Sequence, residues 1–220
     1  MSFFLTILLA FLQSSASAPA RIPDTNALVE GVERSFARMK DLSADFVQIS
    51  QDSLNRKRQE SGHLYLMRSR KMRFEYKTPE DHLFVSDGKT LYSYVPADRQ
   101  VNKESVRETV DDRIPLMFLL GRSNLRNEFR SFERLTSQPV VPGTHAIKMN
   151  PKRKTDFREI VIEVEPSTFR VRRLSFTYVD GGQTEFIFSN IRTNSGLKDS
   201  LFDFKVPPGV EVVEGIGSEN

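Results

Sequence analysis

The residues that most often carry out chemistry are few in this sequence and lie far apart. The three histidines, His63, His82 and His145, occupy different segments, and none has the HxxxH spacing of metal ligands. No cysteine is available to complete a zinc site, and the sequence contains no GxSxG, P-loop or GxGxxG motif. The neighbouring acids Asp111 and Asp112 are more typical of a solvated or capping position than of a catalytic pair. We therefore expect no enzymatic activity, no bound metal and no cofactor.

Basic residues form four clusters, although the net charge is only +3. Most such clusters lie at loop tips or on the solvated face of a sheet. The alternative is that they guide the protein to a partner or an anionic surface, within a Debye length of about 10 Å. The clusters lie at residues 56–58, 68–73, 152–154 and 170–173.

The stretch RKMRFEY, residues 70–76, alternates between apolar and charged side chains. Met72, Phe74 and Tyr76 fall on one face of an extended strand, because successive side chains point to opposite sides. This pattern indicates a half-buried strand with an aromatic face. That face could belong to an ordinary core or to a wall that a ligand contacts.

The same period of two recurs from residue 42 onward in nine or more short segments. Short strands joined by short loops are typical of an antiparallel sheet or barrel. Asp87-Gly88, between two of these segments, predicts a two-residue hairpin. No long Gly/Ser-rich linker and no fixed repeat divides the chain, which indicates one domain.

Two segments have helical rather than strand character. Residues 24–41 carry an apolar stripe at helical spacing, with Asp24 or Thr25 as the cap. A shorter helix is expected to begin at Pro115 and end at Gly121. Because it is apolar around most of its surface, this second helix must be covered on several sides or must face a space that is sometimes filled.

The N-terminus resembles a signal peptide. Residues 3–12 form an uncharged apolar run, and small residues follow it, so we expect a signal peptide over residues 1–18 with cleavage after Ala18 or Ala20. Ten apolar residues make about 15 Å of helix, roughly half the thickness of a bilayer core. Export argues against a nucleic-acid partner, and the absence of cysteine excludes a lipid anchor. We expect one domain over residues 19–220, located in the periplasm.

Several motifs, in one order from about residue 43 to 213, resemble the outer-membrane lipoprotein carrier protein (LolA) family. They are Phe46-x-Gln48, Gly62-x-Leu64-Tyr65, Arg73-Phe74-x-Tyr76-x-x-Pro79, Ser86-Asp87-Gly88-Lys89 and Pro207-Pro208-Gly209-Val210. The resemblance implies a mainly β fold with an α lid, in which helices cover an incompletely closed antiparallel β-barrel. It also implies an apolar cavity that shelters lipoprotein acyl chains.

The same resemblance implies a route and partners. A periplasmic carrier of this kind takes acylated lipoprotein cargo from an inner-membrane lipoprotein-releasing ABC transporter and delivers it to the outer membrane, where an acceptor lipoprotein receives it if one is present. We expect a monomer. The alternative is a periplasmic binding module on the same barrel for free lipid or a glycolipid.

The family also suggests which residues face the cavity. Arg68 matches a strand-end arginine that is thought to hold the lid closed by reaching backbone carbonyls at the lid helix ends. The alternative for Arg68 is a side chain that extends from the rim into water. The family usually has proline after this arginine, whereas this chain has Ser69. The expected acyl-binding residues are Phe36, Phe46, Leu64, Leu66, Met72, Phe74, Tyr76, Leu116, Met117, Phe118 and Leu120.

Overall fold

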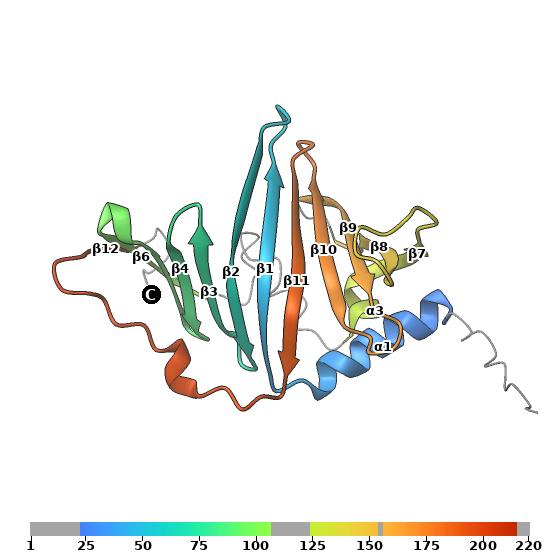
Figure 1. Ribbon diagram of the computed structural model, residues 1–220, viewed down its shortest axis with the longest axis horizontal. Helices are drawn as coiled ribbons and strands as arrows, with labels where there is room; N and C mark the ends of the chain where they lie inside the picture. The colour runs from blue at the N-terminus through green and yellow to red at the C-terminus, as the bar shows by residue number, and fades with distance from the viewer. Residues whose placement is uncertain (1–22, 107–123, 154–155, 215–220) are drawn as a thin grey trace, which may run out of the picture.

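The computed structural model describes residues 23–106, 124–153 and 156–214. One large sheet dominates them (Figure 1). In chain order the elements are α1 (Thr25–Arg38), β1 (Asp41–Gln51), β2 (Lys57–Met67), β3 (Lys71–Thr78), β4 (His82–Asp87), β5 (Thr90–Val95), η1 (Pro96–Asp98), β6 (Gln100–Ser105), α3 (Leu125–Glu128), β7 (Phe129–Arg134), β8 (His145–Pro151), β9 (Phe157–Val164), β10 (Val171–Tyr178), β11 (Gln183–Thr193), η2 (Asp199–Phe202) and β12 (Glu211–Glu214).

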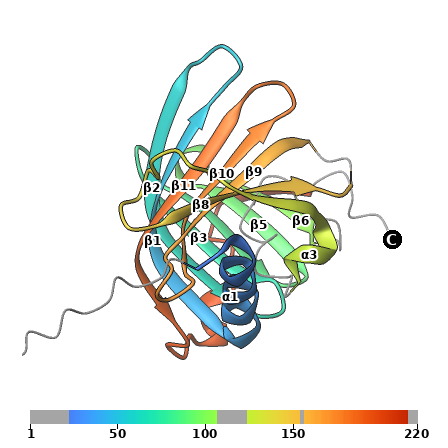
Figure 2. The same cartoon turned by 90° about the vertical axis from the view of Figure 1, so that its right-hand side faces the viewer.

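The 12 strands pair in the order β12-β6-β5-β4-β3-β2-β1-β11-β10-β9-β8-β7. Neighbouring strands are antiparallel except for β12, which runs parallel to β6. The sheet curls, and within the described strands its two edges, β7 and β12, do not pair with each other (Figure 2). The predicted mainly β fold, an incompletely closed antiparallel barrel, is confirmed. No helix in these ranges has the length and apolar character needed to cross a membrane.

Helix α1 lies at the end of the sheet where β1 begins (Figure 1). Asp24 caps it as predicted, since its carboxylate accepts a hydrogen bond of 2.8 Å from the backbone N–H of Ala27. The helix buries Leu28, Val29 and Val32, which share one face at helical spacing. The predicted stripe therefore covers the apolar side of the sheet. The second predicted helix, residues 115–121, lies outside the described residues.

The hairpin predicted at Asp87-Gly88 is present, shifted by one residue. Asp87 ends β4 and Thr90 begins β5, so Gly88 and Lys89 form the turn. Gly88 has a φ of 97°, which glycine adopts without a steric cost. The Asp87 carboxylate accepts hydrogen bonds from the backbone N–H groups of Lys89 and Thr90 at 2.7 and 2.8 Å, which fixes the turn.

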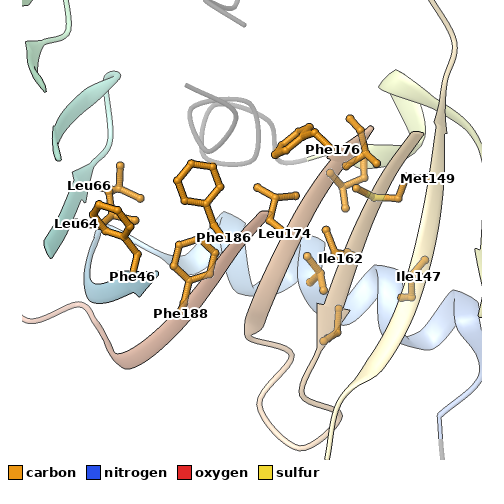
Figure 3. Packing of buried hydrophobic residues seen from close by; sticks show 14 of the residues in the cluster. Phe46, Leu64, Leu66, Ile147, Met149, Ile162, Leu174, Phe176, Phe186 and Phe188 are labelled. Atoms are coloured by element: carbon orange, nitrogen blue, oxygen red, sulfur yellow. The ribbon is translucent and has the colours of Figure 1, made fainter. Parts of the chain in front are cut away.

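One face of the sheet carries a continuous apolar layer (Figure 3). Phe46 of β1, Leu64 and Leu66 of β2, and Phe186 and Phe188 of β11 project to the same side and are buried. The layer continues over β10, β9 and β8. The alternating pattern of the sequence therefore places its apolar side chains on the inner face of the curl.

Gly62 sits at the tightest point of this layer. It pairs with Phe46 on one neighbouring strand and with Tyr76 on the other. The two rings approach each other with centroids 5.0 Å apart. A Cβ atom at position 62 would overlap the backbone carbonyl oxygen of Glu75. Only glycine fits here without displacing β3.

The charged face of β3 is less exposed than the sequence suggests. The C-terminal segment covers it, with Phe202 of η2 fully buried. The Lys71 ammonium lies 3.0 Å from the Asp199 carboxylate. The Arg73 guanidinium lies 2.5 Å from the Glu75 carboxylate, and both side chains are only 22% exposed. The interpretation of residues 68–73 as a solvated cluster is therefore wrong for Lys71 and Arg73.

The same correction applies to Arg173 in the cluster at residues 170–173. Its side chain is 15% exposed and lies 3.1 Å from Glu163 and 2.6 Å from Glu185. The buried Glu163 carboxylate also accepts hydrogen bonds from the backbone N–H groups of Val140 and Val141. This network fastens the loop before β8 to the outer face of the sheet, because a buried carboxylate needs such partners.

Candidate apolar binding pocket

An apolar pocket lies where the last turns of α1 face the sheet. Its cavity volume is about 40 Å³, and it opens into a wider hollow that includes open solvent. The apolar lining consists of Phe36 and Met39 at the end of α1, Leu42 and Ala44 of β1, Leu64 and Leu66 of β2, Phe188 and Ile191 of β11, and Phe169 and Val171 at the β9–β10 turn.

Strand register explains why these side chains meet. Leu42 pairs with Leu66, and Ala44 pairs with Leu64, across β1 and β2. Directly opposed residues of an antiparallel pair point to the same face, so four apolar side chains form one floor. The small side chain of Ala44 leaves space above this floor, which the end of α1 covers.

Arg68 joins the β2–β3 turn to the end of α1. Its Nε donates a hydrogen bond of 2.9 Å to the Met39 carbonyl, and its Nη2 donates to the Ala37 carbonyl. Its backbone N–H donates to the Lys40 carbonyl at 3.2 Å. The last carbonyls of a helix lack partners within the helix, and a cation is favourable at that end. The guanidinium therefore lies on the helix end beside the pocket.

The family model for the outer membrane lipoprotein carrier protein LolA matches residues 37–205 of this chain. The chain belongs to this family. The outer-membrane lipoprotein carrier protein of Haemophilus influenzae is 33% identical over 179 residues, which cover 80% of this chain and 82% of that protein. The protein of that name from Glaesserella parasuis is 30% identical over 213 residues, covering 96% of this chain and 95% of the relative.

Comparison with a solved structure gives information on the fold only. The crystal structure of an uncharacterized conserved protein from Thermus thermophilus superposes with a TM-score of 0.55 at 13% identity, covering 86% of this chain and 98% of that one. The fold is therefore shared with a protein of only 13% sequence identity.

The acyl-binding residues predicted from the LolA family fall into three groups in the structure. Phe36, Leu64 and Leu66 line the pocket. Four others belong to the adjoining apolar layer of the inner face: Phe46, Met72, Phe74 and Tyr76. The predicted lid residues Leu116, Met117, Phe118 and Leu120 lie outside the described residues. Their roles in ligand binding remain predictions.

Other pocket residues were not predicted, although a local signal existed for some of them. Leu42 and Ala44 continue the alternation that ends at Phe46, and Phe188 stands in an equally regular strand. Phe169 had no such signal, because it lies in the β9–β10 turn and reaches the pocket only through the fold. The alternation of apolar residues therefore could not predict that Phe169 lines the pocket.

The turn after Arg68 explains a departure from the LolA family pattern. Ser69 and Arg70 have φ values of 65° and 62°, in the left-handed region. Proline is fixed near a φ of about −65° and cannot adopt this conformation. The serine therefore suits the turn that presents Arg68 to α1.

Two polar side chains at the margin of the apolar layer, Tyr76 and His82, have shifted pKa values. The Tyr76 hydroxyl donates a 2.6 Å hydrogen bond to the Gln48 side chain, and burial raises the pKa of Tyr76 far above its usual range. His82 Nε2 lies 2.9 Å from the Ser93 hydroxyl, with its ring 4.0 Å from the ring of Phe84. Burial lowers the pKa of His82, and the charge of Arg58 acts in the same direction.

This shift predicts a pH-dependent loss of stability. The unfolded chain protonates His82 near pH 6.5, whereas the folded protein does so only at lower pH. Acidification below about pH 6.5 therefore favours the unfolded state. His82→Gln keeps a polar partner for Ser93 and cannot be protonated. We expect its free energy of unfolding to fall less between pH 7 and pH 5 than that of the wild type, as measured by urea denaturation. Equal falls would contradict this role for His82.

The three histidines remain apart in the fold. His63 Nδ1 lies 2.7 Å from an Asp45 carboxylate oxygen, and His145 Nδ1 lies 2.7 Å from the Arg134 guanidinium. Among the described residues, no group of three or more histidine, cysteine or acidic side chains has a geometry suited to a metal ion. Within these ranges, the apolar pocket between α1 and the sheet is a candidate ligand site.

Proposed function

We propose that this protein is a periplasmic carrier that shelters the acyl chains of lipoproteins and transfers them towards the outer membrane. The observation that carries the proposal is the apolar pocket between α1 and the inner face of the sheet. Membership of the LolA family and relatives named as outer-membrane lipoprotein carriers support the same function. Carriers of this family bind and release their cargo rather than transform it.

The magnitude of the hydrophobic effect suggests how cargo is held and released. Burial of one CH₂ group contributes about 0.8 kcal/mol, so one acyl chain of ~15 methylenes would gain about 12 kcal/mol. Several fully buried chains would exceed the practical limit of about 18–21 kcal/mol for non-covalent binding. A carrier must release its cargo, so we infer that the chains stay partly exposed. Tight binding of a triacylated lipoprotein that no acceptor can remove would contradict this mechanism.

The proposed partners follow from this route. An inner-membrane lipoprotein-releasing ABC transporter supplies the acylated cargo, and an outer-membrane acceptor lipoprotein receives it where one exists. We propose that the carrier acts as a monomer.

Native mass spectrometry tests the function. The protein is co-expressed with a lipoprotein and with its exporter, then purified and measured intact. We expect a 1:1 complex with the acylated lipoprotein. Recovery of diacyl lipid alone would refute the carrier function and favour the alternative of a module for free lipid or glycolipid.

The proposal assigns Arg68 the role of a latch between the sheet and α1. Arg68→Leu removes the side-chain hydrogen bonds to the Met39 and Ala37 carbonyls. Hydrogen bonds from a charged group contribute about 1.5–3 kcal/mol, so we expect hydrogen exchange at the end of α1 to accelerate roughly 10- to 150-fold. We also expect slower or lost transfer of cargo to an acceptor.

Arg70→Leu is the matched control for the latch. Arg70 lies in the same turn and is exposed, and the same charge is removed. We expect its exchange and transfer rates to match the wild type. Identical rates in Arg68→Leu would show that Arg68 is only a rim residue.

A further inference from the structure

A second cleft, polar in character, adjoins the apolar pocket. Its cavity volume is about 280 Å³, and part of the cleft is open to solvent. Four residues line both spaces: Ser35, Met39, Phe169 and Thr193. The two spaces therefore meet at the end of α1, one apolar and the other polar.

Phe169 forms the wall between them. Its ring covers Gly31 of α1 so closely that a Cβ atom there would overlap it. A φ of 57° is unusual for a bulky residue, and the turn holds it through a 2.8 Å hydrogen bond from the Phe169 N–H to the Glu165 carbonyl. The β9–β10 turn thus fixes an aromatic ring at the junction of the two spaces.

Two arginines of α1, Arg34 and Arg38, line the polar cleft. No acidic side chain is among the residues that line it in the described part of the chain. The Arg34 guanidinium lies 6.0 Å from the centre of the Phe169 ring, so it sits beside the junction. The cleft therefore presents positive charge next to an apolar pocket.

Contacts within the protein occupy only some of the hydrogen-bond donors of Arg34 and Arg38. Arg34 lies 3.7 Å from Glu30, but Glu30 also pairs with Arg126 at 3.2 Å. Arg38 stands in the last turn of α1, where a cation is favourable. The carbonyls of Ala37 and Met39 at that end already accept hydrogen bonds from Arg68. Both guanidinium groups thus have donors left for a ligand.

We propose that this cleft is a head-group subsite for the acyl ligand, in which Arg34 and Arg38 bind an anionic group attached to the polar end of a chain held in the apolar pocket. A guanidinium matches the geometry of carboxylate and phosphate oxygens. The inference rests on the proposed function and adds a preference to it. Ligands with an anionic head bind more tightly than neutral ligands with the same chain.

Displacement of an uncharged apolar dye, N-phenyl-1-naphthylamine, tests the preference. Palmitate and hexadecanol have the same chain length and differ in head charge. We expect palmitate to displace the dye from the wild type at a concentration roughly five- to tenfold lower. In Arg34→Gln/Arg38→Gln this advantage should disappear, while displacement by hexadecanol stays unchanged. Both arginines are exposed, so the variant is expected to fold.

Arg126→Gln/Arg130→Gln is the matched control. It removes the same charge from exposed positions outside the cleft, one of which also contacts Glu30. We expect this control to keep the preference for palmitate. Loss of the preference in both variants would attribute it to overall charge and overturn the subsite.

Two further pairs of ligands distinguish the source of the anionic group. Hexadecyl phosphate compared with hexadecanol represents a lipid phosphate. Palmitoyl peptides with aspartate or asparagine beside the acylated residue represent a carboxylate in the cargo. At least one pair should lose its difference in Arg34→Gln/Arg38→Gln. Equal displacement by anionic and neutral ligands in the wild type overturns the subsite but leaves the carrier function intact. Failure of every acyl ligand to bind overturns both.

Discussion

Replacing Phe36 with aspartate should weaken the binding of a fluorescent fatty-acid analogue about 100-fold, which corresponds to about 2.7 kcal/mol. Phe36 is only partly buried and lines the pocket from α1. An aspartate there would place an unpaired carboxylate beside the acyl chain, and desolvation of that charge opposes binding. Fluorescence titration measures the affinity, and circular dichroism verifies that the variant remains folded.

Two variants separate this effect from general ones. Phe36→Leu preserves an apolar wall and should bind within about fivefold of the wild type. Leu54→Asp makes a comparable change at the tip of the β1–β2 hairpin, where the side chain is 72% exposed and outside the pocket. Its affinity should equal that of the wild type. Similar affinities for Phe36→Asp and Leu54→Asp would locate the binding site elsewhere.

The largest effect on stability is expected for Gly62→Ala. The added methyl group would overlap the Glu75 carbonyl oxygen, so β3 must move away from β2. Overpacking with a backbone shift costs about 3 kcal/mol or more, which for a chain of this size lowers Tm by roughly 6–12 °C. Thermal unfolding followed by circular dichroism measures the change.

Gly182→Ala is the control for this prediction. Its nearest contact would be a side-chain oxygen of Asp180 at 3.2 Å, at the tip of the β10–β11 hairpin. A side chain at a loop tip can adjust, so we expect a loss below about 1 kcal/mol. Equal losses in the two variants would show that the close approach of β3 to Gly62 is not what requires glycine.

The strand faces could be predicted from sequence because a period of two is a local property. Met72 and Phe74 are buried on the inner face as their alternation indicates. The opposite face was interpreted less well. Lys71 and Arg73 contact η2, more than a hundred residues further along the chain, and no local pattern reports that a remote segment covers them. The exposure of these two side chains was therefore overestimated from the sequence.

The pocket was predictable only in part for a similar reason. Leu64 and Leu66 stand in a regular strand, so their inward direction follows from the alternation. The space above them depends on where α1 ends and on how the β9–β10 turn places Phe169. Both are results of tertiary packing between distant segments. Resemblance to the LolA family predicted a cavity, but the residues that line it could be identified only from the fold.

Photo-crosslinking tests whether an acyl chain occupies the pocket between α1 and the inner face of the sheet. A lipoprotein with a diazirine near the end of its acyl chain is bound to the carrier and irradiated, and the crosslinked peptides are mapped by mass spectrometry. We expect crosslinks to the pocket segments around Phe36, Leu42, Leu66 and Phe188. Crosslinks confined to the outer face, such as the η2 segment over β3, would contradict this binding site.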